Sequence, residues 1–183
     1  MTADPAAFSH PFRVAALPAR KATHFDLRPG ETALAAIAGA LGLLGLGALS
    51  FRGELRPAGR RDWVLEADLA ATATQACVVT LAPVPSRIAE RIVRRYVADL
   101  PEPEAEEVEM ADETVEPLPA VIDAGEVMVE ALALALPCYP RAEGAEFSAA
   151  EARPKDAAPL DDEETTRPFA GLADLMKKGG SGD

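Results

Sequence analysis

The chain has 183 residues, nearly half of them apolar, and a net charge of -12. This length suffices for one domain of ordinary size plus a tail. The negative charge excludes a general attraction to phosphate, so any contact with RNA must be local and basic.

The charge is divided unevenly along the chain. Residues 1–100 contain 12 Lys and Arg against 9 Asp and Glu, whereas residues 101–183 contain 6 against 21. A folded body followed by solvated acidic segments has this layout. We therefore expect a domain over residues 1–147 with an acidic loop at about 101–116, and a mostly disordered tail over 148–183.

The first elements are short. Apolar and polar residues alternate over residues 12–17 and 23–27, which predicts two strands. Residues 31–44 place leucine and isoleucine at helical spacing. The uncharged stretch 32–50 is just long enough to be considered as a membrane span, but four glycines dilute its hydropathy. We favour a buried helix that runs into a strand, and a membrane-associated protein is the distant alternative.

The clearest β signal covers residues 48–81, where apolar residues alternate with polar ones on both sides of a turn at 56–60. This pattern predicts a long hairpin with one buried face and Trp63 as its large apolar anchor. A strand over 63–81 would be unusually long, so we expect a bulge or bend near 70–75. Residues 87–97 suit a helix or a half-buried strand equally well.

A second helix is expected over residues 123–136. Asp123 is a good N-cap, Glu126 follows three residues later, and Pro137 stops the helix. Residues 168–178 form a short amphipathic box within the tail. Together these elements predict an α+β domain, an antiparallel sheet with a long central hairpin and two main helices packed on it.

A search for catalytic chemistry finds little. His10 and His24 have no candidate nucleophile beside them, and Cys77 and Cys138 lack the paired spacing of a zinc site. No phosphate-binding glycine loop occurs. We therefore predict no enzyme activity, no metal and no cofactor. Isolated thiols also fit a reducing cytoplasm, and residues 1–8 do not form a secretory signal.

Arginines are the remaining candidates. They gather on the hairpin and on the following element, and they are Arg52, Arg56, Arg60, Arg61, Arg87, Arg91, Arg94 and Arg95. If the two elements pair, these guanidinium groups could share one region, as phosphate-binding clusters do. The alternative is that they neutralise the acidic loop and keep the surface hydrated. The pattern leaves both interpretations open.

Several ordered blocks resemble the YceD family, the large ribosomal RNA subunit accumulation proteins. The first is Gln-Ala-Cys-Val-Val-Thr-Leu-Ala-Pro-Val-Pro from Gln75; the second contains Asp-Ala-Gly-Glu and Glu-Ala-Leu-Ala-Leu-Ala-Leu-Pro; the third is Tyr-Pro-Arg-Ala-Glu-Gly-Ala. The closing Pro-Phe-Ala-Gly-Leu from Pro168 is similar to the family's last box. The residues that carry the resemblance are Gln75, Cys77, Thr80, Pro83, Asp123, Gly125, Glu126, Glu130, Pro137, Tyr139, Pro140 and Arg141.

The resemblance implies a cytoplasmic, non-enzymatic factor for accumulation or processing of large-subunit (23S) ribosomal RNA, and it favours a strand at 87–97. Its partner would be that RNA or a pre-ribosomal particle, not DNA. A protein partner could dock on the C-terminal box through Phe169, Leu172, Leu175 and Met176. An RNA-free adaptor for an assembly protein is the alternative. Many bacterial relatives carry a Cys-x-x-Cys pair where this chain has Cys77 and Thr80, so a metal-binding interpretation of those relatives does not transfer.

Overall fold

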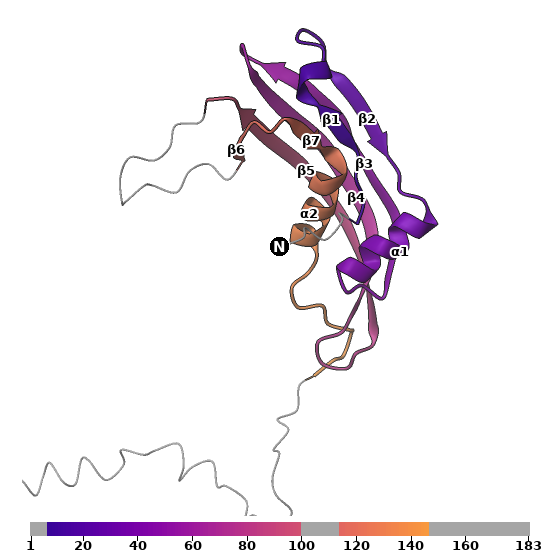
Figure 1. The fold of residues 1–183 in the computed structure, drawn as a ribbon. Helices are drawn as coiled ribbons and strands as arrows, with labels where there is room; N and C mark the ends of the chain where they lie inside the picture. Colours follow the sequence, from indigo (N-terminus) through magenta and orange to yellow (C-terminus); the bar gives the residue numbers. More distant parts are fainter. Residues whose placement is uncertain (1–6, 100–113, 147–183) are drawn as a thin grey trace, which may run out of the picture. The chain divides into compact units, whose positions relative to one another are not determined.

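A computed structural model describes residues 7–99 and 114–146, which belong to one compact unit, Met1–Glu146 (Figure 1). The described residues form an α+β fold with a five-stranded sheet, a two-stranded sheet and two α-helices. The predicted fold class is therefore confirmed. The C-terminal docking candidates (Phe169, Leu172, Leu175 and Met176) lie outside the described residues.

The large sheet has the order β2-β3-β4-β5-β6. Its strands are β2 (Thr23–Leu27), β3 (Gly45–Ala58), β4 (Asp62–Ala76), β5 (Pro83–Val97) and β6 (Val115–Pro117). The first four strands pair antiparallel in succession, and β6 adds parallel to the end of β5. Residues 87–97 are thus strand, and the predicted hairpin exists as β3 and β4.

The N-terminal strand does not join this sheet, contrary to the prediction. β1 (Pro11–Arg13) pairs with β7 (Val121–Asp123) in a separate two-stranded sheet. The predicted strand over 12–17 is also too long, because a 3-10 turn, η1 (Val14–Ala16), follows β1 directly. Alternation over a few residues does not specify a pairing partner, and here the partner comes from the segment just before the second helix.

The predicted bulge occurs on the other strand of the hairpin. The β3–β4 register shifts between Gly47 and Ser50, opposite Ala70–Thr72. Ala48 has a positive φ of 51° within this shift. The extra residue therefore bends β3, while β4 continues unbroken to Ala76, where a turn replaces the predicted continuation to 81.

Both helices form near their predicted positions. α1 (Glu31–Ala40) ends four residues earlier than expected and is followed by a turn and then β3, which is the preferred interpretation of the uncharged stretch. α2 (Ala124–Ala135) begins after Asp123, whose carboxylate accepts hydrogen bonds from the backbone N–H groups of Gly125 and Glu126. No helix in the described ranges has the length and apolar character needed to cross a membrane.

The core lies between α2, α1 and one face of the large sheet. Side chains alternate along a strand, so the odd positions of β4, the odd positions of β3 after its register shift and the even positions of β5 share this inner face. Phe51, Leu65 and Leu69 are fully buried there, and Met128 and Leu132 of α2 pack against them. The opposite, outer face carries most of the charged side chains of the sheet, and Glu90, Arg94 and Glu116 are on the inner face.

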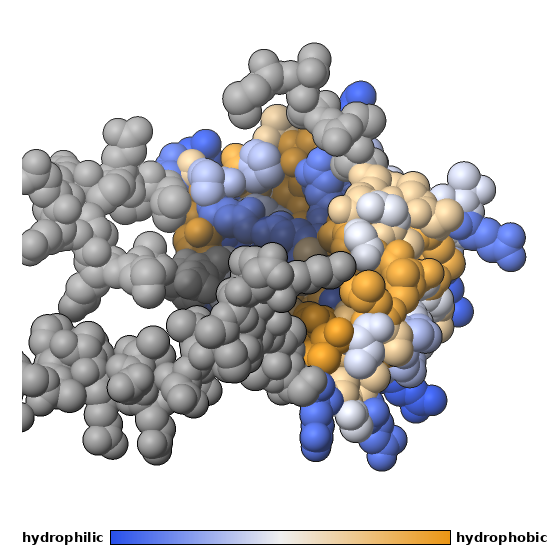
Figure 2. All heavy atoms as spheres, turned by 90° about the horizontal axis from the view of Figure 1, so that it is seen from below, coloured by the Kyte–Doolittle hydropathy of each residue, from blue (hydrophilic) through white to orange (hydrophobic). Residues whose placement is uncertain are grey.

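Figure 2 shows apolar residues gathered at the end of the molecule where α1 lies, with hydrophilic residues around them. A groove of about 520 Å³ between α1 and the start of β3 is lined by Leu34, Leu43 and Leu46, and Leu44 beside it is 60% exposed. α1 therefore buries only Ile37 and Ala38. The helix is less buried than the sequence predicted.

Candidate nucleic-acid interface

Strand pairing brings five of the eight candidate arginines to the outer face. Arg52 and Arg56 lie on β3, and Arg87, Arg91 and Arg95 lie on β5. Residues directly opposite each other in neighbouring strands present side chains on the same face, and β4 connects the two groups in register. The predicted pairing of the two basic elements is thus indirect, with β4 between them.

Carboxylates of the same face neutralise part of this cluster. Glu66 of β4 accepts hydrogen bonds from Arg56 through one oxygen and from Arg91 through the other, the latter at 3.2 Å. The hydrogen bond from Arg56, followed by that from Arg91, lowers the pKa of Glu66 despite partial burial. Across the strands, Asp26, Arg52, Asp68 and Arg91 form one row of alternating charge. The centre of the outer face is therefore mixed in charge.

The β5 margin of this face is more basic. Arg87 stands opposite Thr72, and Arg95 stands opposite Val64, so neither has a carboxylate directly across the ladder. Within residues 7–99 and 114–146, no hydrogen bond or ion pair engages the guanidinium group of either residue. With Arg91 between them, they form a row spaced by about 13 Å along β5, at roughly 3.3 Å per residue. We call these three residues the β5 arginine row.

The other three candidates lie elsewhere. Arg94 is on the inner face, where it pairs with Glu116 of β6 at 2.6 Å and Glu130 of α2 at 2.9 Å. Arg60 and Arg61 lie in the turn between β3 and β4, and Arg61 pairs with Asp99 at 3.1 Å. Arg94 cannot belong to the same surface as its neighbours, because consecutive strand residues face opposite sides.

The first sequence block meets the end of the second block and the third block at one junction. The Gln75 side-chain amide donates to the carbonyl of Pro137 at 3.1 Å, and the N–H of Val78 donates to the carbonyl of Pro140 at 2.9 Å. The N–H of Ala142 donates to Cys77 Sγ at 3.3 Å. These bonds tie the β4–β5 turn to the segment after α2, so the block residues that meet here have a structural role that spacing along the chain could not reveal.

Cys77 is fully buried at this junction, and its sulfur is a hydrogen-bond acceptor. The Thr80 hydroxyl makes the largest contribution, and the N–H groups of Ala142, Thr80 and Val79 add to it. Together they lower the pKa of the Cys77 thiol from 9.0 to about 6, although burial acts in the opposite direction. The N–H groups that surround the sulfur favour the thiolate.

A lowered pKa of Cys77 makes stability depend on pH. Between pH 6 and 9 the native state holds fewer protons than the unfolded chain, because Cys77 is a thiolate only in the native state. The stabilisation of the fold by this thiolate is therefore fully present above pH 9 and is lost as the pH falls through about 6. We expect Cys77→Ala to lower the melting temperature more at pH 9 than at pH 6, under reducing conditions. Cys138→Ala, at an exposed cysteine, is the control. An equal loss at both pH values would contradict a native thiolate.

The second block holds the N-terminal segment against α2. Beyond capping α2, Asp123 accepts hydrogen bonds from the Ser9 hydroxyl and from the His10 N–H, the latter at 2.7 Å. Gly125 packs so closely against this segment that a Cβ would lie 2.7 Å from the His10 nitrogen. Glu130 pairs with Arg94. Each of these residues therefore serves the fold.

The described residues contain no group of three or more His, Cys, Asp or Glu side chains that could hold a metal ion. The candidate site of the structure is therefore a charged sheet face with a basic margin.

The family model described as "Large ribosomal RNA subunit accumulation protein YceD" matches residues 65–176. The chain therefore belongs to the YceD family, whose description implies a role in accumulation of large-subunit ribosomal RNA. No curated protein and no solved structure matched the chain.

Proposed function

We propose that this protein is a non-enzymatic, cytoplasmic factor of large-subunit assembly that binds 23S ribosomal RNA, or an early particle containing it, through the β5 arginine row. The observation that carries the proposal is the position of Arg87 and Arg95 on one exposed sheet margin, without carboxylates opposite them. Family membership supplies the RNA class. Guanidinium groups bind phosphate with two donors, which suits them to a negatively charged backbone.

The β5 margin of the outer face provides the local basic surface that an acidic protein needs. Its five arginines stand among Asp26, Glu54, Glu66 and Asp68, so the face as a whole is nearly neutral. At a Debye length of about 8 Å, Asp26 and Glu54 are largely screened from β5 under physiological salt, because they lie two or more strands away at about 4.8 Å per strand. Glu66 and Asp68 lie on the neighbouring strand and are not screened. RNA bound at the β5 margin would therefore respond to the three arginines of the row and to these two carboxylates, and Arg91 could exchange Glu66 for a phosphate.

A protein adaptor that binds no RNA is the second candidate, and the mixed charge at the centre of the outer face favours it. Alternating rows such as Asp26, Arg52 and Asp68 suit a partner surface of complementary pattern more than a uniformly negative polymer. Salt distinguishes the two candidates. Arginine–phosphate binding weakens steeply with salt, whereas a contact with a mixed or apolar protein surface weakens less.

The test is to deplete the protein in its host and restore it with variants of the full chain. We expect depletion to lower large-subunit relative to small-subunit ribosomal RNA, and Arg87→Glu with Arg95→Glu to fail to restore the ratio. With purified protein and a 23S transcript, the same variant should reduce the slope of log affinity against log salt by about 1.5, the value for two lost phosphate contacts.

The matched control reverses two exposed arginines outside the sheet face, Arg13→Glu with Arg20→Glu, so the net charge changes equally. This control should restore the ribosomal RNA ratio. If both variants restore it, the β5 arginine row does not bind RNA and the adaptor becomes the better candidate. If depletion leaves the ratio unchanged, a function in large-subunit RNA accumulation is wrong for this chain.

A further inference from the structure

β5 has an open edge along its middle. β6 pairs only with Arg95–Val97, and β4 occupies the other side of β5. The Arg95 N–H donates to Thr114 and the Val97 carbonyl accepts from Leu118, so odd-numbered residues of β5 direct their backbone groups toward this edge. The β4–β5 register has no shift, so this direction holds back along the strand. Within the described part of the chain, nothing hydrogen bonds to the outward backbone groups of Arg87, Ala89 and Arg91.

The prolines of β5 agree with this assignment. Pro83 and Pro85 are both odd-numbered, and a proline is tolerated in a strand where its missing N–H would have pointed away from the neighbouring strand. The two prolines prevent strand addition along the first part of the β5 edge, and β6 occupies the last part of the edge. The stretch around Arg87–Arg91 remains open, although exposed edges are usually blocked in native proteins.

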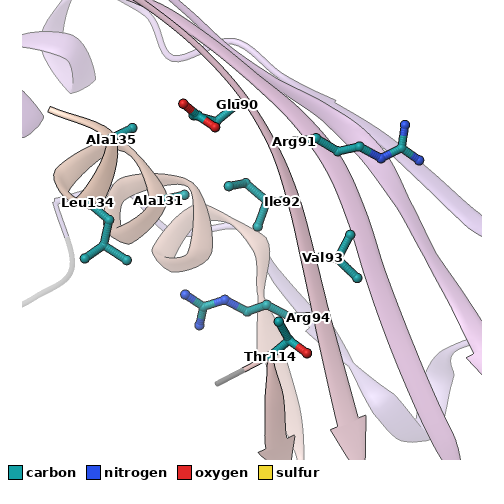
Figure 3. Close-up of a pocket in the computed structure, with 9 residues that line it drawn as sticks. All are labelled: Glu90, Arg91, Ile92, Val93, Arg94, Thr114, Ala131, Leu134 and Ala135. Carbon is teal, nitrogen blue, oxygen red and sulfur yellow. The ribbon is translucent and has the colours of Figure 1, made fainter. Parts of the chain in front are cut away.

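The open edge adjoins a groove of about 560 Å³ between β5 and α2, lined by apolar side chains of both elements together with Glu90 and Arg94. Figure 3 shows Ile92 and Arg94 on the side of β5 that faces α2, while Arg91 and Val93 point to the other side. Ala131, Leu134 and Ala135 form the helical wall of the groove, and the Leu134 side chain is 78% exposed. The edge thus offers backbone hydrogen-bonding groups with arginines on one side. On the other side lies a groove whose helical wall is apolar and whose strand side carries Glu90, Ile92 and Arg94.

We propose that the open edge of β5 binds an extended segment of a partner protein as an added strand, with acidic side chains toward Arg87 and Arg91 and apolar side chains toward the groove beside Leu134. Backbone hydrogen bonds supply affinity in this mode of recognition, and pockets for alternate side chains supply specificity. Side chains directly opposite Arg87 and Arg91 share their face, so carboxylates there are favourable. This site goes beyond the proposed RNA function: it uses the open backbone edge of β5, although Arg87 and Arg91 beside that edge also belong to the β5 arginine row.

A second copy of the chain fits this edge poorly. Antiparallel self-pairing centred on Ala89 places Arg87 opposite the second copy's Arg91, and pairing centred on Glu90 or Arg91 places two identical charges opposite each other. Like charges directly opposite across a sheet are destabilising. The charge pattern therefore selects an acidic partner strand.

The probe is a synthetic extended peptide in which glutamate and valine alternate, with a lysine–valine peptide as its control. We expect the full chain to bind the acidic peptide at least about tenfold more tightly. In amide exchange followed by NMR, the N–H groups of Arg87, Ala89 and Arg91 should exchange fast in the free protein and slowly with peptide. The N–H groups of Ile88 and Glu90, which face β4, should be slow in both.

Ala89→Pro removes one outward N–H and leaves every arginine in place, so it should weaken peptide binding by about tenfold without altering association with 23S RNA. Ala89→Val keeps the N–H and is its matched control. Leu134→Asp, at an exposed helix position, should weaken binding by about fivefold and needs no change in the strand. These variants separate a failure of this site from a failure of the RNA proposal.

Three results would overturn the inference. Equal binding of the acidic and basic peptides would show that Arg87 and Arg91 do not select an acidic strand. Slow exchange of the Arg87, Ala89 and Arg91 amides in the free chain would mean that another part of this chain, or a second copy if the protection depends on concentration, already occupies the edge. Unchanged peptide affinity in both Ala89→Pro and Leu134→Asp would place the peptide elsewhere.

Discussion

Gly53→Ala is expected to lower the free energy of unfolding by about 4 kcal/mol, near the upper end for a single substitution. A Cβ on Gly53 would lie 2.1 Å from the backbone oxygen of Glu66 and 2.5 Å from the Cβ of Ala67. Both neighbours belong to β4, so β3 and β4 would have to separate at the middle of the hairpin. Alanine normally gains about 0.4–1 kcal/mol over glycine by restricting the unfolded chain, which is too little to offset this overlap.

The measurement is thermal unfolding, where a loss of this size should lower the melting temperature by about 10 °C. Gly45→Ala is the matched control in the same strand, because its Cβ would meet only the Thr74 side chain at an ordinary contact distance of 3.8 Å. Comparable melting temperatures for the two variants would show that β3 and β4 do not approach so closely at Gly53.

Much of the large sheet was predictable because long alternation leaves few choices. Trp63 to Ala73 share one parity over eleven positions, and the structure buries the whole set on the inner face. The cap of α2 was also predictable, because Asp123 and Glu126 have a spacing with a local mechanism. Pairings between strands that lie far apart in the sequence were not predictable. Nothing in the three residues of β1 specifies β7 as a partner, and β6 follows an acidic stretch that resembles only a loop.

The arginine cluster shows the same limit at the candidate site. Once residues 87–97 are known to be a strand, parity alone separates Arg94 from Arg91 and Arg95. While helix and strand remained equally possible, all four β5 arginines could be placed together. Pairing with Glu66 depends on the β4–β5 register, which no local pattern contains. The residues of the β5 arginine row were therefore found by sequence, but their division into paired and unpaired groups required the structure.

Arg94→Glu is expected to destabilise the fold by about 3 kcal/mol, because it would place a third carboxylate beside Glu116 and Glu130. The Arg94 side chain is only 16% exposed. Burial alone would lower the pKa of Arg94, but the hydrogen bond to Glu130 and the charges of both glutamates outweigh it and raise the pKa. The estimate lies at the low end for a broken buried pair, since both glutamates are partly exposed.

Arg95→Glu is the matched control for this prediction, since it makes the same charge change one residue away on the exposed outer face. Its effect on the free energy of unfolding should stay within about 0.5 kcal/mol. Urea unfolding of the two variants separates a structural arginine from a surface arginine: Arg94→Glu should shift the midpoint strongly, and Arg95→Glu hardly at all. If the two midpoints coincide, Arg94 does not link β5, β6 and α2, and its exclusion from the RNA-binding surface is wrong. If they differ as expected, loss of ribosomal RNA in an Arg94 variant reports unfolding, whereas the same loss with Arg87→Glu and Arg95→Glu reports a missing contact.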